Sequence, residues 1–206
     1  MDAEAHYYER LRQFAGEVVE PGAIVLLGSS HLEWFDAPRL LPGRRFVNRG
    51  IAGDRLGLTD RGILHRLELS VFRCQPAFVV FENGANDLGE LWRTGTPPMQ
   101  DIIAAYERVV VTIRGRLPDV PMRIVNVLPT TGGFAGLNPY VRELNPHVTR
   151  IAAAYQCTHL DFYCAVLDES GELRGDLTAD GLHLNEAGYA LLAERLAPLV
   201  PPPEAR

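Results

Sequence analysis

The sequence contains no lysine, and all 20 of its basic residues are arginine. This absence excludes Schiff-base chemistry, serine–lysine dyads and the lysine of a phosphate-binding Walker motif. The formal net charge is -6, so the chain offers no overall basic character of the kind that nucleic-acid binding needs. Serine is scarce as well, with four residues. An enzyme built from this sequence must therefore choose its nucleophile and its base from a short list of side chains.

Cysteine is also scarce. Cys74, Cys157 and Cys164 are odd in number and lack CxxC spacing, which excludes a disulfide framework and a zinc knuckle, and we expect buried thiols. The opening residues, MDAEAHYYERLRQ, mix acidic and basic side chains and contain no apolar run. They predict neither a signal peptide nor a membrane span. We therefore expect a cytoplasmic protein.

Apolar residues recur in a pattern that switches between short buried strands and amphipathic helices. Strands are predicted at residues 23–27, 45–47, 77–81, 123–128 and 159–162. Helices are predicted at about residues 3–19, 99–117, 140–155 and 186–196, and residues 201–206 are expected to fray. This alternation is typical of a parallel sheet covered by helices on both faces. The length of 206 residues, with 47% apolar, predicts one domain over residues 1–206.

In such a fold the loops at the carboxyl edge of the sheet carry the function. The first predicted strand ends in Gly28-Ser29-Ser30-His31, which places a hydroxyl at the start of a helix, where a nucleophile can be exposed. A helix N-cap is the competing interpretation of this serine. The G-x-S-x-G elbow of the α/β-hydrolases is absent, because residue 32 is leucine.

Two further loops offer hydrogen-bond donors. Residues 48–54, NRGIAGD, include Gly53, whose lack of a side chain lets backbone N–H groups approach a developing negative charge. Residues 82–87, ENGAND, include Asn86, whose amide can donate to an oxyanion or cap the next helix. Neither loop is specific by itself, since glycine-rich turns are common in α/β folds.

The last motif is Asp180-Gly181-Leu182-His183. An aspartate three residues before a histidine can accept from the imidazole Nδ1–H, which leaves Nε2 facing a serine as a general base. A surface hydrogen bond is the competing interpretation. The expected position of this motif, at the same sheet edge as the other three loops, favours the general base.

Together, the blocks GSS, NRGIAG, GAND and DGLH resemble, in the same order, those of the GDSL or SGNH hydrolase family, over residues 23 to about 196. The resemblance implies a three-layer α/β/α fold with a central five-stranded parallel sheet, as in flavodoxin-like proteins. It implies that Ser30 is the nucleophile and that Asp180 and His183 complete a catalytic triad. The implied oxyanion donors are Ser30, Gly53 and Asn86. The aspartate of the family's GDS motif is Ser29 here, and Ser30 remains the third residue of the motif.

This resemblance implies a serine esterase that cleaves carboxylic esters with short to medium acyl groups through an acyl-serine intermediate. O-acetylated sugars and lysophospholipids are candidate substrates. An acyltransferase that uses the same triad and a non-catalytic ligand-binding module stay open as alternatives. The residues expected to bind the substrate are His31, Leu91, Trp92, Thr130 and Phe134. We expect a small-molecule ester as the partner, with no nucleic acid and no cofactor, and assembly into homo-oligomers stays open.

A metal site is not expected, because the His-x-x-Glu pairs at residues 65–68 and 183–186 are isolated and no HExxH motif occurs. His31 is the only rival to His183 as the base, and we expect it to line the pocket or to pack, since no carboxylate follows it in the next turn. From Arg44 to Arg73 seven arginines stand against three acidic residues. This stretch suits an anionic substrate or a solvated helix face.

Overall fold

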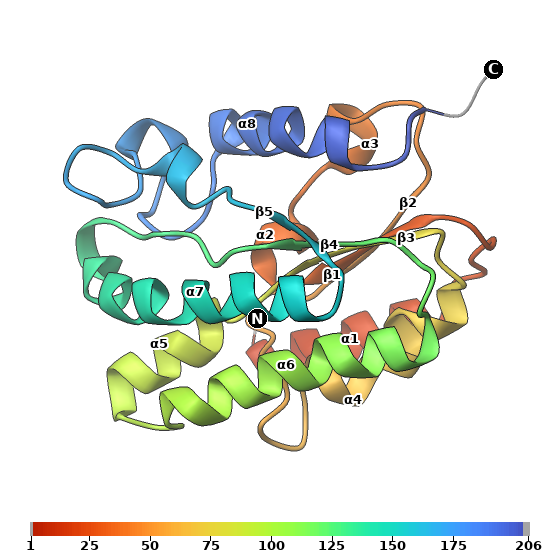
Figure 1. Ribbon diagram of the computed structural model, residues 1–206, viewed down its shortest axis with the longest axis horizontal. Coiled ribbons are helices and arrows are strands. Elements are labelled where there is room, and N and C mark those ends of the chain that lie inside the picture. The colour runs from red at the N-terminus through yellow and green to blue at the C-terminus, as the bar shows by residue number, and fades with distance from the viewer. Residues whose placement is uncertain (1, 204–206) are drawn as a thin grey trace.

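A computed structural model describes residues 2–203, and its centre is a five-stranded parallel sheet (Figure 1). The strands are β1 (Ile24–Gly28), β2 (Phe46–Gly50), β3 (Phe78–Glu82), β4 (Met122–Val125) and β5 (Thr158–Leu160). They lie in the order β2-β1-β3-β4-β5, which is the order of flavodoxin-like sheets. Because all neighbouring strands are parallel, their carboxyl ends lie at one edge of the sheet.

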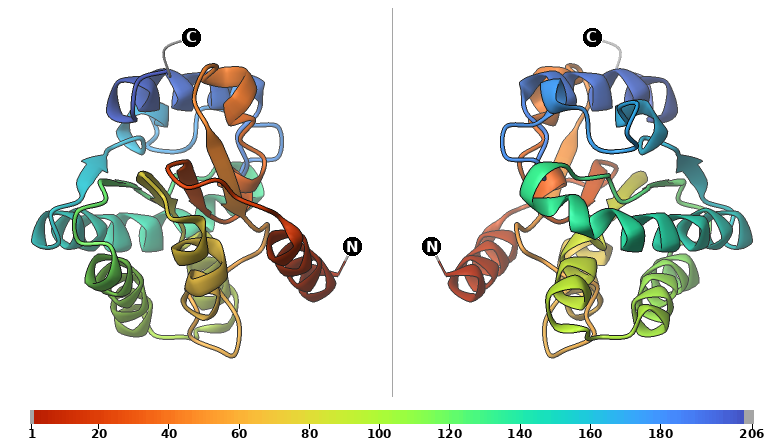
Figure 2. Two further views of the ribbon diagram at one scale, coloured as in Figure 1. Left: turned by 90° about the vertical axis from the view of Figure 1, so that its right-hand side faces the viewer. Right: turned by 90° about the vertical axis from the view of Figure 1, so that its left-hand side faces the viewer.

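Helices cover both faces of the sheet. They are α1 (Ala3–Gly16), α2 (Ser30–Glu33), α3 (Ala37–Leu40), α4 (Ile63–Ser70), α5 (Ala85–Thr94), α6 (Met99–Arg116), α7 (Asn138–Ala154) and α8 (Glu186–Leu196). Helices α3 and α8 lie on one face, whereas α4, α5, α6 and α7 lie on the other, as Figures 1 and 2 show. This arrangement confirms the predicted three-layer α/β/α fold.

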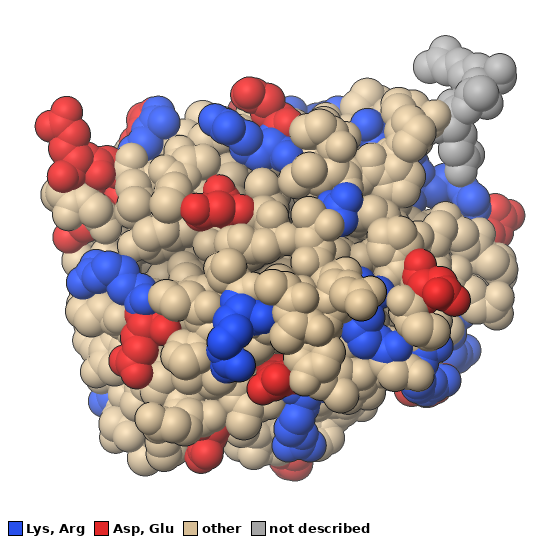
Figure 3. All heavy atoms as spheres, viewed as in Figure 1, with Lys and Arg blue, Asp and Glu red and all other residues tan. Residues whose placement is uncertain are grey.

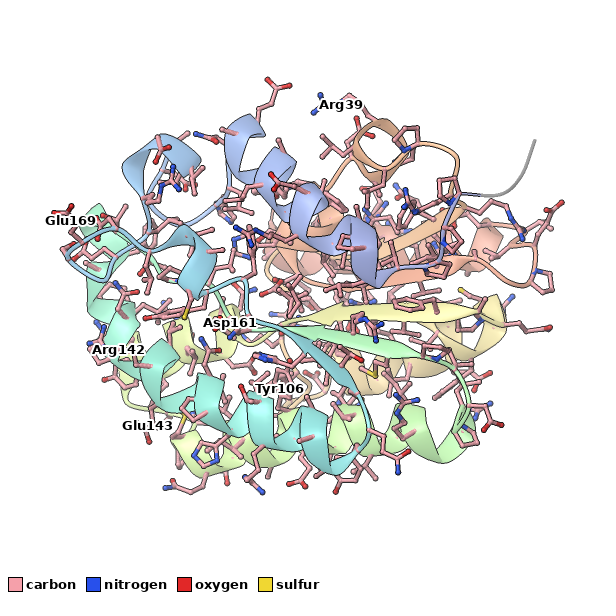
Figure 4. All side chains as sticks on the ribbon, turned by 45° about the horizontal axis from the view of Figure 1, so that its top comes forward. Arg39, Tyr106, Arg142, Glu143, Asp161 and Glu169 are labelled. Carbon is pink, nitrogen blue, oxygen red and sulfur yellow. The ribbon has the colours of Figure 1, made fainter. Side chains whose placement is uncertain are left out.

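Alternate residues of the buried strands pack into two separate hydrophobic cores, one on each face of the sheet. In β1, Val25 and Leu27 pack into the core that α4 to α7 cover, whereas Ile24 and Leu26 pack into the core beneath α8. Because both faces are covered, β1 needs no polar alternation, and its residues Ile24 to Leu27 form an apolar run. Figure 4 shows side chains filling both layers, including fully buried Tyr106 of α6.

The predicted elements are present, with shifts at their ends. The N-terminal helix ends at Gly16 instead of residue 19, because Glu17 has an extended backbone and Val18 is 97% exposed. Strand β4 ends at Val125 instead of residue 128. The reason is that Asn126 turns its side chain to residues beyond β5, where its Oδ1 accepts from Phe162 N at 3.0 Å.

Cys74 and Cys157 are buried, but Cys164 is exposed, so the prediction of a buried thiol was wrong there, because its short 3₁₀ turn lies outside β5. In the tail that was expected to fray, the Pro201 carbonyl accepts a hydrogen bond of 2.8 Å from Arg44. Residues 204–206, the rest of that prediction, lie outside the described residues.

The surface carries charges of both signs. On the face seen in Figure 3, arginines and acidic side chains are interspersed. No helix within residues 2–203 is long and apolar enough to cross a membrane.

Candidate active site

Ser30 stands where strand β1 ends and helix α2 begins. Gly28, the last residue of β1, has no room for a side chain, because a Cβ there would lie 2.3 Å from the Glu82 carbonyl oxygen. Ser29 occupies the N-cap position and its side chain makes no capping hydrogen bond. The competing N-cap interpretation of the motif is therefore not supported. The Ser30 Oγ instead lies 3.1 Å from His183 Nε2.

Asp180 accepts three hydrogen bonds, two from His183 and one from Leu182. Its Oδ2 accepts from the imidazole Nδ1 at 2.6 Å, and its Oδ1 accepts from the backbone N–H groups of Leu182 and His183 at 2.9 and 2.7 Å. Partial burial disfavours the charge of Asp180, but the hydrogen bonds from His183 and Leu182 outweigh it and lower the pKa of this carboxyl. Because an ionised carboxylate only accepts, the proton of the neutral imidazole lies on Nδ1, and Nε2 is free to accept from Ser30.

Two aromatic rings flank His183. The ring of Trp34 lies 4.5 Å from the imidazole, centroid to centroid, and that of His31 lies at 5.8 Å. Trp34 is 49% exposed although it is large and apolar. The sequence did not single out Trp34, because only the folded chain brings the end of α2 against the loop before α8.

The two expected donor residues, Gly53 and Asn86, lie together beside Ser30. Gly53 has a φ of 77°, a left-handed conformation that favours glycine. The side-chain amide of Asn86 donates to the Asp54 carbonyl at 2.9 Å, which connects the loop after β2 to the start of α5. All three residues line one cavity with His183. Four strand-end loops that are distant in sequence therefore meet at one point.

This cavity has a volume of about 380 Å³ and an apolar side wall. Trp92 and Phe134 line it, as expected, together with Leu137. Leu91 and Thr130, which were also expected to bind substrate, do not line it. Leu91 points from the other side of α5 into the core, and Thr130 is buried with its Oγ1 2.7 Å from the Phe134 carbonyl.

His31 also lines the cavity, although only 3% of its surface is exposed. Its Nε2 lies 3.1 Å from the Leu182 carbonyl, and its Nδ1 lies 3.7 Å from Glu82 Oε2. The sequence shows no orienting carboxylate in the turn after His31. In the structure, Glu82 at the end of strand β3 supplies one. Sequence reasoning missed Glu82, because a strand-end glutamate carries no signal of its partner.

A buried arginine joins the two loops that carry Ser30 and Gly53. Arg66 of α4 donates to the carbonyls of Gly28 and Arg49 at 3.1 and 2.8 Å, and it pairs with Asp54 at 2.7 Å. Arg66 and Asp54 are 2% and 4% exposed. Helix periodicity alone predicts an apolar residue at such a position, so this contact could not be predicted from the sequence.

The N-terminal helix contributes to the site as well. Glu33, at the end of α2, accepts from the Ala52 backbone N–H and pairs with His6 and Arg10 of α1, at 3.0 and 3.1 Å. Ala3, at the start of α1, lines the cavity. Helix α1 therefore supports the loop that contains Gly53.

The arginine-rich stretch does not form one free basic surface. Arg49 pairs with Glu17, Arg61 with Glu4, and Arg55 with Glu90 at 3.0 Å. Of these, Arg55 lines the cavity. Within residues 2–203, no group of three or more histidine, cysteine, aspartate or glutamate side chains is placed to hold a metal ion.

Known structures share this fold. A protein from Streptococcus pneumoniae that is named for platelet activating factor is 24% identical, with a TM-score of 0.81 over 96% of this chain and 92% of that chain. A GDSL-like lipase from Bacteroides thetaiotaomicron is 19% identical, with a TM-score of 0.80 over 95% and 97%. The acetyl xylan esterase AlAXEase is 17% identical, with a TM-score of 0.71 over 87% and 100%. The comparison with curated proteins gave no match.

The sequence itself matches a family model. The model is that of the GDSL-like lipase/acylhydrolase family, and the match covers residues 28–191. It begins at the last residue of β1 and ends within α8, so it includes all four loops that line the cavity. The chain belongs to the GDSL-like lipase/acylhydrolase family.

Proposed function

We propose that this protein is a serine esterase that hydrolyses carboxylic esters through an acyl-serine intermediate. The observation that carries the proposal is the hydrogen-bonded chain from Ser30 Oγ to His183 Nε2, at 3.1 Å, and from His183 Nδ1 to Asp180 Oδ2, at 2.6 Å. Membership of a family of lipases and acylhydrolases supports it. This series of hydrogen-bonded side chains ends, at Ser30, in the cavity that Gly53 and Asn86 also line.

The reaction follows from the role of each group. Ser30 Oγ attacks the ester carbonyl carbon while His183 Nε2 takes the hydroxyl proton, and the carbonyl oxygen becomes an oxyanion. His183 then gives this proton to the leaving alcohol as the bond between the carbonyl carbon and the alcohol oxygen breaks. In the second half, water attacks the acyl-serine with the same base, and the free acid leaves. Asp180 stays ionised and orients the imidazole.

The oxyanion needs donors that are in place before the reaction. We assign this role to the backbone N–H groups of Ser30 and Gly53 and to the side-chain amide of Asn86. One hydrogen of that amide is used by the Asp54 carbonyl, which leaves the second for the substrate. Each such donor typically lowers the barrier by about 3 to 4 kcal/mol.

The cavity favours short to medium acyl groups. Its volume of about 380 Å³ is at the small end of ligand sites, and Trp92, Phe134 and Leu137 give it an apolar wall. For the alcohol portion we consider an acetylated sugar or a lysophospholipid. Similarity to an acetyl xylan esterase supports the first, and the apolar wall is compatible with the second.

The decisive experiment compares Ser30→Ala with Ser29→Ala. Both serines are buried and adjacent, so the second variant is a matched control. We expect Ser30→Ala to lose hydrolysis of p-nitrophenyl acetate, butyrate and octanoate and to lose labelling by a fluorophosphonate probe, with unchanged circular dichroism. Ser29→Ala should keep both activities. Turnover at the wild-type rate in Ser30→Ala would exclude the proposed nucleophile. An acyl group transferred to an added alcohol in place of water would instead indicate an acyltransferase.

A further inference from the structure

A second histidine–carboxylate pair lies directly beneath the loop that carries His183. His31 and Glu82 are 3% and 2% exposed, and His31 Nδ1 lies 3.7 Å from Glu82 Oε2. The other ring nitrogen of His31, Nε2, lies 3.1 Å from the Leu182 carbonyl oxygen. Two adjacent residues of α2, Ser30 and His31, thus contact two adjacent residues of the loop, His183 and Leu182.

The contacts of His31 determine where its protons are. A carbonyl oxygen only accepts, so Nε2 must carry a hydrogen to donate to Leu182. Nδ1 then faces the buried Glu82 carboxyl at 3.7 Å, and a negative charge at that distance favours a proton on Nδ1. Within the described residues, none of His31 Nδ1, Glu82 Oε1 and Glu82 Oε2 has a hydrogen-bond partner. The contact between the two side chains is therefore an electrostatic one across 3.7 Å.

Electrostatics favour the same protonation state. Burial lowers the pKa of His31, but the nearby Glu82 carboxylate, with smaller contributions from the Leu182 carbonyl and Asp180, outweighs it and raises the pKa above its ordinary value. The titratable groups around the pair are Asp180 and His183 on the loop before α8, Tyr189 on α8, and Tyr106 on α6. Burial and the charge of Glu82 both raise the pKa values of the two tyrosines, so they stay neutral.

We infer that His31 is a positioning residue, held in one protonation state by Glu82. His31 fixes the Leu182 carbonyl and thereby aims the His183 imidazole at Ser30. The inference rests on the proposed function of Ser30 and His183. It assigns no proton transfer to His31. A shift of Leu182 would move the adjacent imidazole, and a displacement of about 1 Å at a reacting group can cost a factor of about 100 in rate.

The test separates positioning from substrate binding, because His31 also borders the cavity. We expect His31→Leu to lower kcat by about 10- to 100-fold with KM within about twofold. His31→Gln, whose amide nitrogen can replace Nε2 as the donor, should recover most of kcat. Glu82→Gln can donate to Nδ1 and hold the same tautomer, so it should retain most of kcat, whereas Glu82→Leu should resemble His31→Leu. A rise in KM alone, or no recovery in His31→Gln, would overturn the inference.

Loss of stability needs its own control. Leu196 of α8 borders the same small internal cavity as His31 and Glu82 but has no polar group. Leu196→Ala should lower Tm while kcat stays within about twofold, which shows that destabilisation near the pair is not enough to lower activity. A fall of kcat in Leu196→Ala as large as in His31→Leu would contradict a specific role for His31.

A measurement that needs no turnover distinguishes the inference from the proposed function. Imidazole 15N NMR of the wild-type protein should show His31 with a proton on Nε2 from about pH 6 to about pH 8. If no ester is hydrolysed but this signature is present, the proposed function fails and the protonation assignment stands. If esters are hydrolysed but Nε2 of His31 is bare, the inference fails alone.

Discussion

The side-chain amide of Asn86 donates a hydrogen bond to the backbone carbonyl of Asp54, 2.9 Å away. This contact joins the start of α5 to the loop that follows β2, and it lies one residue beyond Gly53. The amide is therefore oriented before any substrate arrives, with one hydrogen still available. Donors that are already in place lower a barrier without the cost of reorganisation.

Removing the Asn86 amide should affect the rate more than binding. We expect Asn86→Ala to lower kcat by a factor of about 10² to 10³, with little change in KM, because the donor acts mainly on the charge that develops in the transition state. Steady-state kinetics with p-nitrophenyl acetate give both constants. Asn185→Ala is the control, since Asn185 caps α8 outside the cavity and should lower stability but not kcat. Equal losses of kcat in both variants would contradict the assignment.

The dependence of the rate on pH should have one acid limb. The pKa of Asp180 is lowered, so this carboxylate stays ionised and contributes no limb of its own near neutral pH. A general base acts only when it is unprotonated, so activity should fall in acid. A rate that stays flat down to about pH 4 would argue against a histidine base.

The hydrogen bonds that join Asp180 to His183 and His183 to Ser30 predict the effect of neutralising Asp180. Asp180→Asn should lower kcat by a factor of up to about 10⁴, because the amide can hold the imidazole in the wrong tautomer. Asp176→Asn is the matched control. Asp176 lies in the same loop region but pairs with Arg174 at 2.6 Å on the surface, so kcat should be unchanged. Kinetics across the pH range measure both variants. If Asp180→Asn keeps the wild-type kcat, Asp180 does not orient the base.

Arg66 and Asp54 should show strong coupling in stability. Arg66→Met leaves the Asp54 carboxylate buried without its ion-pair partner, and we expect a loss of about 3 to 5 kcal/mol of unfolding free energy. Adding Asp54→Asn removes the unpaired charge and should recover part of that loss. Urea unfolding of the two single variants and the double variant gives the coupling energy. Additive losses would show that the two side chains act independently.

Trp92 should limit the length of the acyl chain. Its ring lines the cavity and packs against Gly136, where a Cβ would lie 2.8 Å from the indole. Trp92→Ala removes this wall, and we expect the ratio of kcat/KM for octanoyl over acetyl esters to rise by about tenfold. Trp34→Ala is the control, because Trp34 contacts His183 and should affect both esters alike. An unchanged ratio in Trp92→Ala would place the acyl chain elsewhere.

The fold could be predicted from the sequence because its signal is local. Strand β3 is apolar from Phe78 to Phe81, and α6 shows helical spacing of Ile102, Tyr106, Val109 and Ile113, all of which are buried. Boundaries were less accurate where side chains compete with the backbone, as Asn126 does after β4. Pocket residues were the weakest predictions. Leu91 and Trp92 are adjacent in sequence, but α5 turns the first into the core and the second toward the cavity.

The sequence by itself determined the parallel α/β class, the family and the short list of chemical groups, since these follow from apolar periodicity, from ordered motifs and from the absence of lysine. Only the tertiary structure decided which side chains meet. His183 lies 153 residues beyond Ser30 and reaches its Oγ at 3.1 Å, and Glu82 becomes the partner of His31 at 3.7 Å. Such pairings depend on how the sheet orders its strands and on which face each residue occupies, and no local pattern encodes either.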